Sequence, residues 1–192
     1  MNWQPSLPGI APLGTDHLYF ALVPEEPAAR LINGSALALG SALGLRGMVV
    51  PAERLHLSLH WLGDTCSQYL LALADRAAGV VSGMSPFDVS FDRVATFRSG
   101  REHPLVLLCG DGCEQLCALQ MALAKAIRQA APCQYGWRPF VPHITLVYDR
   151  IRVRERPVAS LSWTVRDFVL IHSLVGQARH ICRGRWQLKG RA

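Results

Sequence analysis

Two short segments of the chain repeat one pattern: histidine, any residue, a hydroxyl residue and leucine. The first begins at His56 and contains Ser58, and the second begins at His143 and contains Thr145. Each lies in an apolar run that predicts a β-strand, and successive side chains on a strand point to opposite faces. Each histidine therefore shares a face with its hydroxyl residue. Two such pairs suit acid–base catalysis at phosphorus, because neutral and protonated imidazoles coexist near neutral pH.

One copy of this motif is a weak signal, because short histidine patterns recur by chance and strands favour Thr, Ile and Leu. The repetition carries the inference, since each copy follows a proline, Pro51 or Pro142, and ends in leucine. The six cysteines show no Cys-x2-Cys pair of the kind typical of zinc sites, and we expect reduced thiols. We therefore expect neither a metal nor another cofactor.

Positive charge is concentrated in the last third of the chain. Residues 138–192 contain eleven Lys and Arg side chains and three carboxylates, whereas residues 1–137 carry a small excess of carboxylates. The basic part includes the second histidine motif, so it would attract a phosphate or an RNA backbone. The alternative is that the run from Arg150 to Arg156 is only a solvated face that aids solubility.

Length and hydropathy indicate a soluble globular protein. The 192 residues, 50% of them hydrophobic, are enough to bury a full core. Residues 1–14 lack the pattern of a secretory signal, and no apolar stretch reaches the ~18 residues of a membrane span. We expect a cytoplasmic protein with no membrane contact and no obligate protein partner. Residues 1–16 are expected to be a flexible lead-in, followed by a single domain of two lobes at residues 17–192.

The hydrophobic pattern predicts an α+β protein with antiparallel sheets. Strands are expected at 17–23, 55–62, 87–95, 105–109, 141–148, 163–174 and 185–188, and helices at 25–45, 67–81 and 114–130. Strands outnumber helices and twice follow one another directly, which argues against a doubly wound parallel sheet. Each motif strand has a helix of similar length nearby, which suggests two related halves.

Three segments occur in the order and spacing of a known family. They are residues 18–24, residues 54–63 (Arg-Leu-His-Leu-Ser-Leu-His-Trp-Leu-Gly) and residues 138–146 (Arg-Pro-Phe-Val-Pro-His-Ile-Thr-Leu). Together they resemble the 2H phosphoesterases, in particular the RNA 2′,3′-cyclic phosphodiesterases that are also called 2′-5′ RNA ligases. The resemblance spans residues 17–188. It implies two pseudo-symmetric lobes of antiparallel sheet, with helices on the outer faces and a central cleft.

The resemblance also implies roles for the motif residues. His56 and His143 would be the catalytic pair, and Ser58 and Thr145 would hold the phosphate oxygens, without a metal or cofactor. Pseudo-symmetry leaves the order of the histidines open, and we take His56 as the acid and His143 as the base. The implied reaction is metal-independent hydrolysis of a 2′,3′-cyclic phosphate end of RNA, or of a nucleotide, to a 2′-phosphate, with reversible 2′-5′ ligation as its counterpart.

One position departs from the family pattern. Close RNA-processing relatives often carry an arginine two residues after the second motif's leucine, where this chain has Tyr148. Arg150 could replace that phosphate contact, or Tyr148 could hydrogen-bond to the substrate or stack on a base, although strand parity predicts that Tyr148 faces away from His143. Two alternatives stay open: the same chemistry on a small cyclic nucleotide-like phosphate, which Tyr148 favours, and a non-catalytic nucleotide- or RNA-binding module.

Residues outside the two motifs are assigned structural roles. Four histidines have no comparable partner in the sequence and are interpreted as structural: His17, His103, His172 and His180. Trp61 and Phe140 are predicted to fill the core.

Overall fold

The computed structural model describes residues 16–131, 139–174 and 176–190. Their elements are β1 (Asp16–Leu22), α1 (Glu26–Ala42), β2 (Met48–Val49), the 3-10 turn η1 (Ala52–Arg54), β3 (Leu57–Gly63), α2 (Gln68–Val81), β4 (Phe87–Thr96), β5 (His103–Cys109), α3 (Glu114–Ala130), β6 (His143–Asp149), β7 (Arg156–Val165), β8 (Asp167–Leu174) and β9 (Arg179–Gln187). Nearly all of the predicted lead-in at residues 1–16 lies outside the described residues. Within the described ranges, none of the helices combines the length and apolarity needed to cross a membrane.

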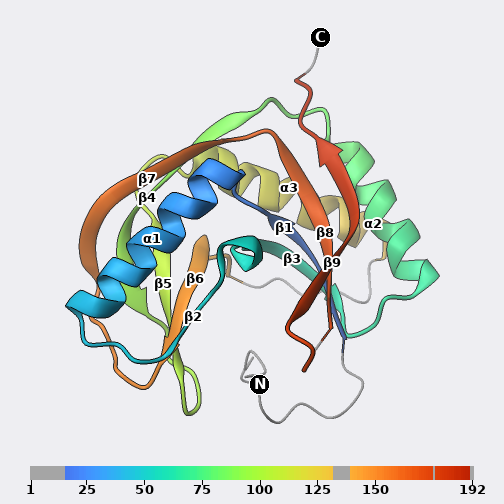
Figure 1. Cartoon of the computed structure of the whole chain (residues 1–192). Helices are drawn as coiled ribbons and strands as arrows, with labels where there is room; N and C mark the ends of the chain where they lie inside the picture. The colour runs from blue at the N-terminus through green and yellow to red at the C-terminus, as the bar shows by residue number, and fades with distance from the viewer. Residues whose placement is uncertain (1–15, 132–138, 175, 191–192) are drawn as a thin grey trace.

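The strands form two antiparallel sheets, one of four strands in the order β3-β1-β8-β9 and one of five in the order β2-β6-β5-β4-β7 (Figure 1). The first motif leads into β3, at the edge of the four-stranded sheet. The second motif lies in β6, next to the short edge strand β2. β3 and β6 contact each other although they belong to different sheets. The predicted α+β fold with antiparallel sheets is confirmed.

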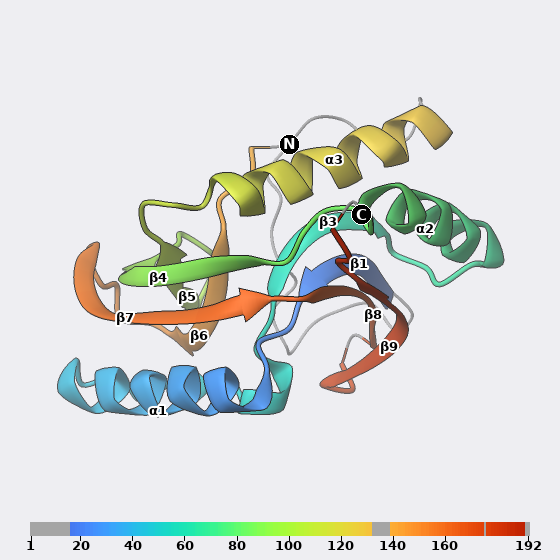
Figure 2. The same cartoon turned by 90° about the horizontal axis from the view of Figure 1, so that it is seen from above.

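The helices interlock the two sheets. α1 follows β1 of the four-stranded sheet but packs against β2, β6 and β7 of the five-stranded one, and β7 arches around it in Figure 1. α3 connects β5 to β6, yet it contacts β3 of the other sheet and packs against α2. Figure 2 shows α1 and α3 on opposite sides of the sheets. One buried cluster includes Phe20 and Phe168 of one sheet and Phe91 and Leu107 of the other, so the two sheets share a core.

Local sequence explains where the helices form. Ser67 precedes α2, and its hydroxyl accepts a hydrogen bond from the Leu70 N–H at 3.2 Å, which satisfies a free donor of the first turn. In α1 the buried residues Ile32, Ala36 and Gly40 recur every fourth position, so one stripe of the helix faces the core. Buried residues follow similar spacings in α2 and α3.

Two predictions are wrong, one about a strand and one about a core residue. The expected strand at residues 163–174 is two strands, because the chain leaves β7 and enters β8 of the other sheet at the exposed Arg166. Trp61 is 42% exposed rather than part of the core. Register shifts between β3 and β1 break the alternation after Leu59, so that Leu62 is buried and Trp61 points outward. Phe140 packs against the core as predicted.

Candidate functional site

The two motif histidines make the same hydrogen bond. Nδ1 of His56 donates to the carbonyl oxygen of Arg54 at 2.8 Å, and Nδ1 of His143 donates to that of Val141 at 2.7 Å. In both cases the acceptor lies two residues before the histidine. Because a carbonyl oxygen can only accept, the hydrogen must be on Nδ1, and Nε2 of the neutral ring keeps a lone pair. Both rings are therefore fixed in a tautomer whose Nε2 can exchange a proton with a substrate.

The fold brings these two imidazoles together. Burial lowers the pKa of His56 and of His143 below the ordinary value, and a charge on His143 lowers the pKa of His56 further. This influence of His143 on His56 agrees with the contact between β3 and β6. Both histidines are partly buried, so the neutral form is favoured in the free protein. The pair predicted from sequence is thus assembled from two different sheets.

A short turn holds the first motif against the second motif strand. η1 ends at Arg54, two residues before His56. The Val50 N–H, just before this turn, donates to the carbonyl of Leu146 in β6 at 2.8 Å, and Asn33 of α1 donates to the carbonyl of Val50 at 2.9 Å. The segment that leads to Arg54 is therefore hydrogen-bonded to β6 and to α1.

Tyr148 joins this site, although strand parity predicts the opposite face. The pairing of β6 with β5 shifts register in the middle of the strand, and both Leu146 and Val147 are buried. After this bulge, Tyr148 returns to the face of His143, and its side chain hydrogen-bonds to Thr145. The prediction that Tyr148 faces away is therefore wrong, because a bulge adds one residue to the alternation.

A glycine turn fixes the backbone at the end of β6. The buried carboxylate of Asp149 accepts three backbone N–H bonds, from Arg46 at 2.7 Å, Gly47 at 2.6 Å and Ile151 at 2.7 Å. These bonds, first of all that from Ile151, lower the pKa of Asp149. A Cβ at Gly47 would lie 1.8 Å from the carbonyl oxygen of Tyr148, so only glycine fits there. The turn therefore holds Tyr148 in place.

The other two predicted site residues lie outside this group of interacting side chains. Ser58 is exposed on β3, two residues after His56. Arg150 is exposed beyond the end of β6, where it lines a hollow of about 520 Å³ together with Arg46 and Glu102. Its charge is not among those that shift the pKa values of His56 and His143. The structure thus groups four of the six predicted residues, leaves Ser58 beside them and places Arg150 apart.

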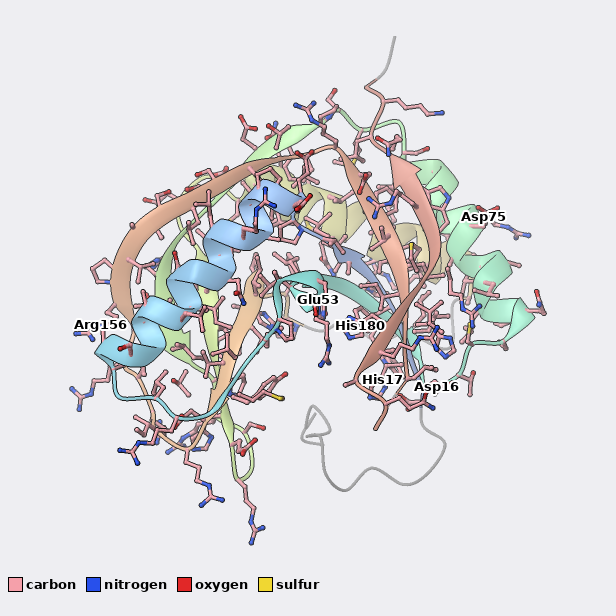
Figure 3. The ribbon with its side chains drawn as sticks, in the orientation of Figure 1. Asp16, His17, Glu53, Asp75, Arg156 and His180 are labelled. Atoms are coloured by element: carbon pink, nitrogen blue, oxygen red, sulfur yellow. The ribbon has the colours of Figure 1, made fainter. Side chains whose placement is uncertain are left out.

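Three further aromatic residues surround the histidines. The phenol of Tyr19 donates to Nε2 of His56 at 3.2 Å, and burial raises the pKa of Tyr19 far above its ordinary value. The ring of His180 meets that of His56 edge-on, with centroids 5.1 Å apart. Phe97 meets His143 in the same way at 5.0 Å. Figure 3 shows His180 near the middle of the molecule.

The fold places His180, which the sequence predicts to be structural, against His56. Burial lowers its pKa to about 4, and charges on His56 and Arg54 lower it further, so it is neutral near pH 7. No sequence signal connects β9 with the first motif. The sequence motifs did not identify Arg54 as a site residue, although it lies two residues before His56 and places a charge next to the motif. Tyr19 lies in an apolar strand and gave no signal.

The charge that acts on the site is positive. The charge of Arg54 lowers the pKa values of Tyr19, His56, Tyr148 and His180. No Asp or Glu of the described residues is among the charges that act on these groups or on the His143 imidazole. In the described ranges, no three His, Cys, Asp or Glu side chains are grouped to hold a metal ion. The arrangement can bind an anion and move protons.

Comparisons with known proteins agree with this geometry. A family model described as the 2′-5′ RNA ligase superfamily matches residues 23–177. TT0787 of Thermus thermophilus is 23% identical, with a TM-score of 0.73 over 92% of this chain and 100% of that one. LigT of E. coli in apo form is 26% identical, with a TM-score of 0.69 over 91% and 98% of the two chains. Its complex with 3′-AMP is 25% identical, with a TM-score of 0.68 over 91% and 99%.

No curated protein sequence matches the chain. The family match, however, covers most of its length, includes both histidine motifs and agrees with the fold and with the resemblance seen in the sequence. The chain therefore belongs to the 2′-5′ RNA ligase superfamily, the 2H phosphoesterases, and has a phosphoesterase-type activity.

Proposed function

We propose that the protein hydrolyses the 2′,3′-cyclic phosphate ends of RNA to 2′-phosphates with two histidines and no metal ion. The matched hydrogen bonds from Nδ1 of His56 and of His143 to the carbonyl two residues earlier carry this proposal. They direct the two Nε2 atoms, of which that of His56 accepts from the Tyr19 phenol in the free protein, to the two proton transfers that such a hydrolysis requires. A binding module has no need of a matched pair.

The reaction assigns one proton transfer to each histidine. His143 takes a proton from water, whose oxygen attacks phosphorus opposite the 3′ oxygen. The bond from phosphorus to the 3′ oxygen breaks, and that oxygen receives a proton from His56. Ser58 and Thr145 donate hydrogen bonds to the non-bridging oxygens, where negative charge develops.

The lowered pKa values fit these roles under one condition. His143 is neutral in the free protein, as a base must be, because burial lowers its pKa. His56 must be protonated to act as the acid, although burial and the charges of His143 and Arg54 lower its pKa. A bound phosphate supplies the negative charge that raises the pKa of His56 again. The acid thus becomes protonated only when substrate is present.

The first experiment tests the reaction and the catalytic pair. The purified protein should convert a 2′,3′-cyclic nucleotide or RNA end to the 2′-phosphate in excess chelator, with a bell-shaped pH profile. His56→Ala and His143→Ala should each lose about 10²- to 10⁴-fold in kcat, whereas His103→Ala, outside the site, should keep the rate. Loss of turnover in chelator, or a full rate in either motif variant, would show that the two-histidine mechanism is wrong.

A substrate with sulfur at the 3′ position tests the order of acid and base. A thiol, with a pKa of about 8.5 in cysteine, leaves without help from an acid far more easily than an alcohol does. The sulfur substrate should therefore restore much of the rate of His56→Ala but not that of His143→Ala. Rescue of His143→Ala alone would exchange the two roles.

The arginines from the end of β6 to the first residue of β7 support RNA as the substrate. Four of them are exposed, and none forms an ion pair with another described residue: Arg150, Arg152, Arg154 and Arg156. Figure 3 shows Arg156 at the outer edge of the molecule, where an RNA backbone has access to it. The second candidate substrate is a small cyclic nucleotide, favoured by the place of Tyr148 beside Thr145 and by the 3′-AMP bound to LigT.

Replacing the four arginines by Gln separates the two substrates. With RNA, the variant should lose kcat/KM, and its binding should depend less on salt, by a slope of roughly 0.7 for each lost phosphate contact. With a 2′,3′-cyclic mononucleotide, kcat/KM should stay as in the wild type. Unchanged kinetics and salt dependence with RNA would favour the small nucleotide.

A further inference from the structure

Arg54 is a charged side chain without a partner charge. Its Nε atom is buried and makes no hydrogen bond, and no carboxylate of the described residues forms an ion pair with it. Other arginines, such as Arg30, Arg93 and Arg185, do pair with carboxylates at the surface. A guanidinium partly removed from water is unfavourable unless an anion accompanies it. An anion at this position would satisfy the buried Nε atom and balance the charge.

The groups near Arg54 show where that anion belongs. Its charge acts on Tyr19 and His56, which lie in or next to the four-stranded sheet, and on Tyr148 of the five-stranded sheet. Phenols and imidazoles of this kind are neutral or positive. An anion that pairs with Arg54 would therefore lie beside these groups of both sheets.

The backbone connects Arg54 directly to both motifs. Its carbonyl oxygen accepts the Nδ1–H bond of His56, and the segment just before η1 is hydrogen-bonded to Leu146, the residue after Thr145. The guanidinium therefore starts from a position that is fixed relative to both histidine motifs.

We propose that Arg54 binds the phosphate of the substrate and supplies the positive charge beside the two motifs. A cyclic phosphodiester carries one negative charge, whereas the transition state and the 2′-phosphate product approach two, because the second pKa of a phosphomonoester is about 6. Arg54 therefore binds the product and the transition state more strongly than the substrate. This step rests on the proposed function, but anion binding by Arg54 does not require turnover.

A binding experiment tests the inference without catalysis. Adenosine 2′-phosphate and inorganic phosphate are titrated into the wild type, Arg54→Gln and Arg54→Lys, with circular dichroism as the check on folding. Arg54→Gln should weaken the binding of adenosine 2′-phosphate by about 10- to 100-fold, the usual range for a lost charge-assisted hydrogen bond. The affinity of Arg54→Lys should lie between those of the wild type and Arg54→Gln, since lysine keeps the charge but not the planar guanidinium. Arg76→Gln, an exposed arginine on α2, should bind as the wild type does.

Kinetics and titration distinguish phosphate binding from a structural role. On a cyclic mononucleotide, Arg54→Gln should lower kcat as well as raise KM, because the lost charge matters most in the transition state. By NMR, the pKa values of His56 and His180 in the free variant should rise, since the charge of Arg54 lowers both.

The outcomes separate the two proposals. Equal affinity of folded Arg54→Gln and wild type for both ligands overturns the role of Arg54. If Arg54→Gln does not fold, the same comparison is made with Arg54→Lys, for which unchanged affinity and kcat overturn it. If binding depends on Arg54 but no cyclic phosphate is hydrolysed, the inference about Arg54 stands and the proposed function fails.

Discussion

His180 should make the stability of the folded protein decrease with acidification. Its pKa is about 4 in the fold, against an ordinary 6.5, because burial disfavours the charged ring and the charges of His56 and Arg54 add to this effect. In the unfolded chain His180 takes up a proton below about pH 6.5, whereas the folded protein resists it until about pH 4. Its contribution is therefore fully present above pH 6.5 and is lost as the pH falls towards 4.

The size of this effect follows from the two pKa values. At pH 5 the unfolded chain gains about 2 kcal/mol from protonation of His180, and at pH 7 almost nothing. The ring is partly exposed, so solvent screening reduces the expected value to about 1–2 kcal/mol. For a chain of this length, that corresponds to roughly 2–8 °C in the midpoint of thermal unfolding.

The substitution His180→Phe tests this value, because phenylalanine keeps an aromatic ring against His56 and Tyr19 but cannot titrate. Urea unfolding at pH 7 and pH 5 gives the loss of stability on acidification for each protein. The loss should be smaller in His180→Phe than in the wild type by about 1–2 kcal/mol. His103→Phe, which removes an imidazole outside the site, should lose as much stability between pH 7 and pH 5 as the wild type does. An equal loss in His180→Phe and wild type would refute the burial of a neutral ring at this position.

Two further substitutions test how the site is held. Gly47→Ala should destabilise the protein by about 1–3 kcal/mol and reduce activity, because its Cβ would meet the carbonyl oxygen of Tyr148. The control Gly83→Ala has open space around its Cβ and should change stability little. Equal free energies of unfolding in urea for the two variants would contradict this prediction. Tyr19→Phe removes the donor to Nε2 of neutral His56 and should raise the pKa of that imidazole, as followed by NMR titration. A lower or unchanged pKa would mean that the phenol does not donate to Nε2.

The sequence by itself determined the properties that depend on local periodicity. The alternation around His56 and Ser58 predicts a strand with a polar and an apolar face, and Leu57 and Leu59 are indeed buried while Ser58 is exposed. The helices were predicted from their apolar stripes for the same reason. The two motifs, with the segment at residues 18–24, were enough to predict the family, because that resemblance depends only on residue types and their order.

The tertiary structure decided everything that depends on strand pairing. The bulge in β6 turns Tyr148 towards Thr145, and the chain changes sheet at Arg166, although neither event has a local signal in a run of apolar residues.

The side chains that surround His56 were also decided by the fold. Tyr19 and His180 reach His56 from β1 and β9, which lie 37 and 124 positions away in the sequence. Register and sheet order are set by contacts between distant segments, so no local pattern contains them. The sequence thus named the two histidines, and only the fold showed their tautomer, their buried neighbours and the Arg54 charge that acts on His56.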